Sequence, residues 1–349
     1  MPETGLQLDD ISVLLLWTAV GIYTLAFIAY AIDLARRSDL AVRAKDAVPA
    51  RELVAAGGIE TVSDVRAQEA RAQSDLEASL GDRRRYLWAR MGTSMTVLGF
   101  LFHVAADVTR GLAAGRVPWS NMYEFALTGT MLIVAVYLVV LLRYDLRFLG
   151  TFITGLVIVL LAATAIWFYT VVVPLADPLK SVWLVIHVFV ASLATALFAL
   201  AFALSVLQLL QARREAAAAA RESVEDGVAA SVATRGVPRF VRTLPSADVL
   251  ESLAYRFAII GFIFWTFTLI AGSIWANDAW GRYWGFDTKE VWTFVIWVLY
   301  AGYIHARATR GWRGTRSAWL SIIGFSAVMF NFTIVNMFFK GLHVYSGLS

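Results

Sequence analysis

Long runs of apolar residues, separated by shorter polar stretches, dominate the chain. Each run holds about 20 residues, the length that a helix needs to cross a hydrocarbon core of about 30 Å. The pattern predicts eight membrane-spanning helices, at about 11–34, 88–109, 122–142, 148–173, 182–210, 250–275, 291–309 and 317–339. We therefore expect an all-α integral membrane protein, built as a bundle of about eight transmembrane helices.

Three sections of the chain differ in character. Residues 1–35 hold the first span, which is too long for a signal peptide and has no small-residue cleavage pattern after it, so we expect it to remain in the mature protein. Residues 36–87 are polar and rich in Ala, Glu and Arg, which predicts a solvated helical segment in the cytoplasm. Residues 88–349 carry the other seven expected spans and form the main membrane domain.

The composition agrees with this organisation. Hydrophobic residues make up 59% of the chain and charged residues 16%, and the mean hydropathy is +0.66. This balance lies far outside that of soluble domains. The net charge of +4 does not indicate nucleic-acid binding, because the basic residues are dispersed among the polar connections. The sequence contains no cysteine, so the chain itself can attach no cofactor through a thioether.

Lys and Arg are distributed unequally between alternate connections. Four polar segments, 36–90, 143–147, 211–256 and 307–316, hold 24 of the 30 Lys and Arg residues. Cytoplasmic connections are enriched in these residues, so this set is predicted to face the cytoplasm. We therefore expect a multi-pass protein of the plasma membrane with both termini extracytoplasmic.

Residues 275–292, WANDAWGRYWGFDTKEVW, form a polar segment with four tryptophans, expected as an extracytoplasmic loop. Tryptophans also form belts at membrane surfaces, so the segment alone assigns no function. Two histidines are expected at the same side: His187 just inside the outer end of the fifth span, and His343 just past the eighth. His305 is near the inner end of the seventh span and His103 is within the second.

Two imidazoles beside a group of indole rings favour haem as the ligand. Haem has two apolar faces that stack on aromatic rings, and imidazole fills the axial positions of its iron. Zinc or copper would need further ligands and would gain nothing from tryptophan. Lys289, Arg282 and Lys340 are candidates to neutralise the propionates.

The segment 275–292 resembles the WWD motif of the haem-handling protein family. Further stretches match this family in the same order: SNMYEF at Ser120, PLKSVWLVIHV, LPSADVLESLAYR at Leu244, WVLYAGYIHAR, and NFTIVNMFFKGLHVYSG near the end of the chain. The resemblance covers roughly residues 88–349. Because several motifs occur in the same order, the resemblance is specific to the CcsA/ResC-type subunit of the system II cytochrome c synthase. A WWD segment alone would indicate only the superfamily.

The resemblance implies roles for individual residues. The family's extracytoplasmic haem-ligand histidines correspond to His187 and His343, and its transmembrane histidine corresponds to His305. The WWD segment implies haem contacts from Trp280, Gly281, Tyr283, Trp284, Asp287 and Trp292. His103 has no clear counterpart, and we interpret it as a structural or a channel-lining residue.

Two positions depart from the usual motif. Phe286 stands where a tryptophan commonly precedes the aspartate, and Thr288 stands where a proline commonly follows it. Phenylalanine keeps an apolar face but has no indole N–H to donate. We interpret Asp287 and Glu290 as helix caps rather than as a general acid and base.

The resemblance also implies a function. The subunit would bind haem b non-covalently as a substrate, relay it across the membrane and present it to the CxxCH segment of an apocytochrome c. A ResB/Ccs1-type membrane subunit would supply a second transmembrane histidine, and a thiol-reducing system would keep the acceptor thiols reduced. No catalytic residue is assigned, because the reactivity resides in the cofactor. Two alternatives remain: a haem transporter or chaperone without ligation activity, and a structural membrane subunit.

Overall fold

The computed structural model describes residues 2–54, 87–174, 177–222, 239–309, 311–339 and 341–342. All secondary structure in these ranges is helical, which confirms the expected fold class. The long helices are α1 (Pro2–Val54), α3 (Leu87–Ala114), α4 (Met122–Leu141), α5 (Gly150–Trp167), α6 (Val182–Glu222), α8 (Ala247–Trp280), α9 (Thr288–Thr309) and α10 (Thr315–Phe330). A π-helical turn (Asn331–Val335) and α11 (Asn336–Phe338) continue directly from α10.

Within the described residues, seven helices are long and apolar enough to cross a membrane. They correspond to seven of the eight expected spans, so the protein is a multi-pass membrane protein. The remaining expected span is α9, a helix of 22 residues that is not among these seven. Its tryptophan, tyrosine and histidine side chains and Arg307 lower its mean hydropathy, although it is part of the same bundle.

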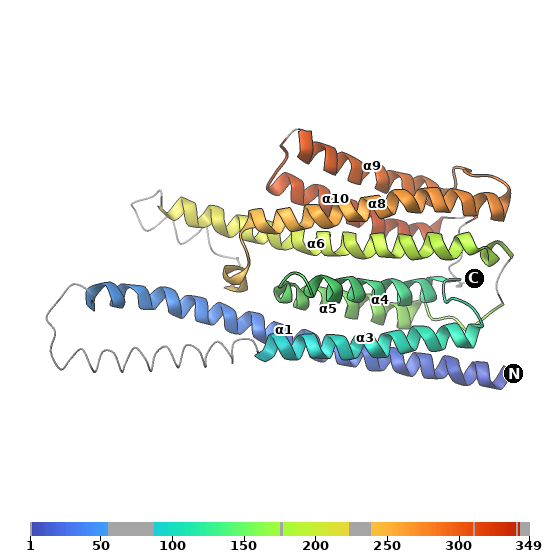
Figure 1. Ribbon diagram of the computed structural model, residues 1–349, viewed down its shortest axis with the longest axis horizontal. Helices are drawn as coiled ribbons and strands as arrows, with labels where there is room; N and C mark the ends of the chain where they lie inside the picture. The colour runs from blue at the N-terminus through green and yellow to red at the C-terminus, as the bar shows by residue number, and fades with distance from the viewer. Residues whose placement is uncertain are drawn as a thin grey trace.

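The helices run side by side along one direction (Figure 1). The long helix α1 packs along α3, and α6 packs along α8, while α4 and α5 lie between these two pairs. On the other side of α6 and α8, α9 and α10 complete the bundle. The α8–α9 connection lies at the same end as the start of α1, and we call this the aromatic end. The α9–α10 connection lies at the opposite end.

The WWD segment consists of a helix end, a short loop and a helix start. Helix α8 continues through Trp280 and ends at Gly281, whose φ of +69° belongs to the left-handed region that glycine adopts without strain. Residues 281–287 form the loop, and α9 begins at Thr288. The loop is therefore shorter than the 18-residue segment that the sequence suggested.

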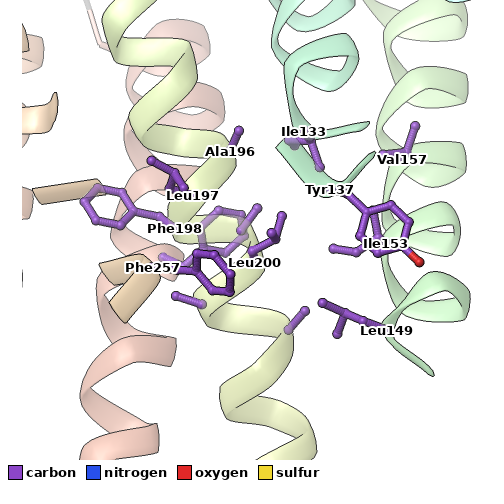
Figure 2. Packing of buried hydrophobic residues seen from close by; sticks show 14 of the residues in the cluster. Ile133, Tyr137, Leu149, Ile153, Val157, Ala196, Leu197, Phe198, Leu200 and Phe257 are labelled. Carbon is purple, nitrogen blue, oxygen red and sulfur yellow. The ribbon is translucent and has the colours of Figure 1, made fainter. Parts of the chain in front are cut away.

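Phe198 of α6 is a fully buried residue of the main core (Figure 2). Its ring stacks on that of Tyr300, with centroids 3.7 Å apart, and Leu197, Leu200 and Phe257 lie around it. A Cβ atom at Gly261 would lie 2.7 Å from the Phe198 ring, so the absence of a side chain lets α8 approach α6. Small residues serve this purpose in membrane helix packing. The core thereby holds α6, whose first turns carry His187, firmly against α8.

Candidate functional site

His187 lies near the start of α6, at the aromatic end of the bundle. Its Nδ1 atom is 2.9 Å from the carbonyl oxygen of Thr268 on α8. A carbonyl oxygen can only accept a hydrogen bond, so Nδ1 carries a proton, and in the neutral imidazole the lone pair is then on Nε2. Histidines that bind metals commonly donate their second ring nitrogen to a carbonyl in this way. The imidazole is therefore held in a tautomer suited to binding a metal.

Two further residues of α8 determine where this ring lies. A Cβ atom at Gly272 would come within 2.6 Å of Cε1 of His187, so the imidazole rests directly against the helix backbone. The Trp275 ring stacks on the imidazole, with centroids 5.8 Å apart and an interplanar angle of 19°. Thr268, Gly272 and Trp275 follow one face of α8 at helical spacing. One face of a single helix thus positions the ring.

Aromatic and aliphatic side chains surround this position. Trp275 contacts Trp280 edge to face, with centroids 4.9 Å apart. Leu179, Leu184 and Val188 form a second apolar cluster with Trp275, and partly buried aromatic residues, including Trp119 and Trp183, pack against it. Such a cluster excludes water from one side of the imidazole and offers apolar surface to a flat ligand.

His187 lines three cavities, and Lys289 lines the same three. The largest, of about 310 Å³, extends between α4, α5, α6, α8, α9 and α10, and its walls are mostly apolar. The second, of about 100 Å³, reaches Trp119, and the third, of about 70 Å³, reaches Tyr283 and Trp284 of the loop. The largest lies within the usual size range of small-molecule sites, which often form between the helices of a bundle.

Glu290 organises the loop 281–287. Its Oε2 atom accepts hydrogen bonds from the backbone N–H of Gly285, at 2.8 Å, and of Asp287, at 3.1 Å. The Asp287 carbonyl in turn accepts from the N–H of Val291. Asp287 is thus the N-cap of α9, and Glu290 bonds back to it from the third helical position, as in a capping box. The interpretation of Glu290 as a capping residue is confirmed.

The described end of the chain packs against this loop. Oδ1 of Asp287 accepts a hydrogen bond of 3.3 Å from the backbone N–H of Leu342. A Cβ atom at Gly341 would come within 1.9 Å of the same oxygen. The backbone at 341–342 therefore lies directly beside the WWD loop. His343, the next residue in the sequence, lies outside the described residues.

The other sequence-predicted residues are distributed as follows. Tyr283 and Trp284 share a cavity wall with His187. Trp292 packs on Phe330 of α10, with centroids 4.4 Å apart, and lines none of the three cavities. His305 is exposed on α9, toward the opposite end of the bundle, and is separate from these cavities.

His103 is fully buried on α3. Its Nε2 atom lies 3.0 Å from the carbonyl oxygen of Leu127, and its Nδ1 atom lies 3.3 Å from the hydroxyl of Tyr23. Nε2–H donates to the carbonyl, and Nδ1 accepts from the tyrosine. Both ring nitrogens are engaged in linking α1, α3 and α4. Of the two interpretations made from the sequence, these contacts favour the structural one.

Sequence reasoning missed Thr268 and Gly272, and also Asn336, whose amide oxygen accepts a hydrogen bond from Nζ of Lys289. Only the first two carried a weak signal, because Thr268 and Gly272 share one face of the sixth expected span with Trp275. No pattern within that span indicates that this face meets His187. Only the packing of α6 against α8 reveals it.

Comparison with known proteins identifies the family. Residues 119–343 match the family described as Cytochrome C assembly protein. Two relatives, both described as "Cytochrome c biogenesis protein CcsA", come from Synechococcus elongatus and Guillardia theta. The first is 32% identical, over 73% of this chain and 87% of the relative. The second is 31% identical, over 74% of this chain and 86% of the relative.

A solved structure shares the fold. It is described as "Cytochrome c Heme Lyase CcmF" and superposes with a TM-score of 0.56 at 15% identity, covering 94% of this chain. The chain spans only 46% of that protein, so the likeness concerns the arrangement of helices alone. The family match and the extensive coverage of the CcsA relatives lead to one conclusion: the chain belongs to the Cytochrome C assembly protein family, as a cytochrome c biogenesis membrane protein of the CcsA type.

Proposed function

We propose that this chain is the haem-handling subunit of a system II cytochrome c synthase and that His187 is an axial ligand of haem iron. One observation carries the proposal: the Nδ1 proton of His187 is bonded to the Thr268 carbonyl, beside cavities with apolar and aromatic walls. A neutral imidazole with its lone pair on Nε2 is the form that binds iron.

The residues around His187 suit haem b, held without a covalent bond. The macrocycle needs apolar walls and aromatic faces, which the cluster around Trp275 offers. Its propionates need cationic or hydrogen-bonding partners, and Lys289 borders the same cavities as His187. Haem is the substrate here, and the chain supplies binding groups and no thiol of its own.

His343 is the proposed second axial ligand. The resemblance to the family suggests it, and the contact between Leu342 and Asp287 supports it, because this contact holds the preceding backbone beside the WWD loop. Two imidazoles would occupy both axial positions of the iron. In the proposed function, the histidine of the acceptor's CxxCH segment then replaces one of them.

His305 is the proposed ligand of an inner site, shared with a ResB-type partner. The exposure of this imidazole on α9 supports the proposal, since an exposed imidazole is accessible to a residue of another subunit. The proposed orientation has the aromatic end outside the plasma membrane, with both termini there. The excess of Lys and Arg in the connections of the opposite end supports this orientation.

In the proposed function, the residues of this chain position the haem ligand His187 and shield the bound haem from water. Thr268 and Gly272 hold the imidazole, the apolar walls exclude water, and the exposed side chains of Tyr283 and Trp284 line the cavity on the side of the loop. Haem supplies the reactive vinyl groups, across which the thiols of the acceptor add, each thiol proton passing to the vinyl carbon. This division of labour is usual when a cofactor carries the chemistry.

A spectrum of the purified protein tests the ligand assignment. We expect the reduced protein to have the absorption bands of a low-spin, b-type haem, and His187→Ala to lose them, with partial recovery on adding imidazole. His103→Gln is the control, because it removes an imidazole that lines none of the three cavities. An unchanged spectrum in His187→Ala would refute the assignment.

Reconstitution separates a synthase subunit from a transporter. We expect covalent haem on a CxxCH-bearing acceptor only when this chain and its ResB-type partner are both present with a thiol reductant. Haem that crosses the membrane without ever becoming covalent would favour the transporter. Covalent product formed without this chain would refute the proposed function.

A further inference from the structure

Lys289 is a basic residue within the wall of the candidate site. It lies in the first turn of α9, its side chain is partly buried, and it lines all three cavities that His187 lines. Its Nζ donates a hydrogen bond to Oδ1 of Asn336. No ion pair to Lys289 is found in the part of the chain that the structure describes.

Asn336 is held in place by the π-helical turn. Its Nδ2 donates to the carbonyl of Phe332, at 2.8 Å, so its amide oxygen is directed to Lys289. Regular α-helical hydrogen bonding is interrupted at Asn331–Val335, and such π-turns occur often at functional sites. The last helix thus presents a neutral acceptor that orients the ammonium without neutralising its charge.

The environment of this ammonium indicates an anionic ligand. An ammonium has three N–H donors, of which the Asn336 oxygen satisfies one. The largest cavity beside it is otherwise mostly apolar, and the cost of burying the ammonium outweighs its attraction to the nearby carboxylate of Asp287. The charge is therefore only partly compensated within the chain. A ligand with an apolar body and a carboxylate would satisfy both the wall and the cation.

The other basic candidates of the sequence are placed differently. A Cβ atom at Gly285 would lie only 0.6 Å from Nη1 of Arg282, so the guanidinium covers the backbone of its own loop. Arg282 lines none of the three cavities. Lys340 lies outside the described residues.

We propose that Lys289, oriented by Asn336, binds a propionate carboxylate of the haem whose iron His187 ligates. The proposal rests on the proposed function and deepens it by naming the anion-binding group of the same site. Lys289 acts as a binding residue that sets the orientation of the macrocycle relative to His187 and takes no part in bond formation.

The test compares haem with its dimethyl ester, in which both carboxylates are uncharged. Titrating the full-length protein in detergent should show that the wild type binds haem about tenfold or more tightly than the ester, the range expected for a charge-assisted hydrogen bond. In Lys289→Met this preference should fall close to one, and in Lys289→Arg it should largely remain. Arg282→Met is the matched control and should keep the wild-type preference.

Equal binding of acid and ester by the wild type would overturn the proposal, as would an undiminished preference in Lys289→Met. If Lys289→Met does not fold, equal binding of acid and ester by the wild type still overturns the proposal, because esterification changes the ligand and leaves the protein intact. The iron spectrum of His187→Ala is a separate readout. A normal spectrum there refutes the iron assignment, whereas a lost acid preference in Lys289→Met still supports the carboxylate site.

Discussion

His187 is oriented by groups that contribute no chemistry of their own. The Thr268 carbonyl fixes the tautomer, Gly272 leaves room for the ring, and Trp275 covers one of its faces. A hydrogen bond from a ligating histidine to a second group is commonly needed for full metal affinity. The position of the imidazole therefore depends on the missing side chain at Gly272 as well as on the ring of Trp275.

Gly272→Ala should disturb the site while sparing the fold. The new methyl group would lie 2.6 Å from His187 Cε1, so the imidazole must shift. Alanine also favours a helix over glycine by about 1 kcal/mol, which offsets part of the packing cost. We expect weaker haem binding and altered absorption bands, measured by titration of the purified variant.

Gly302→Ala is the matched control for this substitution. Gly302 lies on α9, and an added Cβ there meets nothing within 4 Å. Haem binding should therefore match that of the wild type. Equal haem binding by the two alanine variants would show that the close contact between Gly272 and His187 does not contribute to haem binding.

The connection between α8 and α9 is defined by caps at both ends. Gly281 ends α8 in the left-handed region, and Glu290 binds two loop amides from within α9. Phe286, with a φ of +56°, is in the same left-handed region, and 81% of its side chain is exposed. A non-glycine residue there costs of order 1–3 kcal/mol and is often tolerated at functional sites. The loop therefore has a defined conformation, which the hydrogen bonds from its amides to Glu290 stabilise.

Glu290→Ala should loosen this loop. Both amide hydrogen bonds would be lost, at a cost of about 0.5–2 kcal/mol, typical of a removed cap. Hydrogen exchange at the amides of Gly285 and Asp287 should become faster, and the thermal midpoint should fall. Glu290→Gln keeps a side-chain oxygen that can accept and should change both less, because Glu and Gln both serve in capping boxes. Equal exchange rates in both variants would argue against the capping role.

At the scale of the whole molecule, polar groups tie the helices together at each end. At the aromatic end, the buried Arg110 pairs with Asp9 and Glu124 and so joins α1, α3 and α4. At the opposite end, Glu251 of α8 pairs with Arg307 of α9 and accepts from the N–H of Gly314. The pair between Glu251 and Arg307 ties the last turn of α9 to α8, and His305 is exposed on α9 nearby.

In the proposed relay, haem passes from His305, toward one end of the bundle, to the His187 site at the aromatic end. His305→Gly should lower the amount of haem at the His187 site when the chain is expressed with its ResB-type partner, and added imidazole should restore it by replacing the missing ligand. The fraction of protein with bound haem after purification measures this. Normal occupancy without imidazole would show that His305 is unnecessary for loading.

Much of the element pattern could be predicted, because membrane insertion is a property of each segment. Seven spans agree with the apolar runs, and the extension of α6 to Glu222 follows from composition and not from hydropathy. That extension is rich in Ala, Glu and Arg, a composition that favours helix in water and carries no membrane signal. The end of α8 at Trp280 was also missed, because a tryptophan-rich polar segment resembles a loop in hydropathy.

By itself, the sequence determined that the chain spans the membrane repeatedly and that histidines and a tryptophan-rich segment belong to its candidate chemistry. Transfer into lipid sums over the residues of one helix, and a motif is read along one stretch, so neither requires knowledge of neighbours. Only the tertiary structure decided that His187 faces Thr268 and Gly272, that Lys289 shares its cavities and that His103 links three helices. Those relations depend on which faces of separate helices pack together, and packing is set by contacts between segments distant in the sequence.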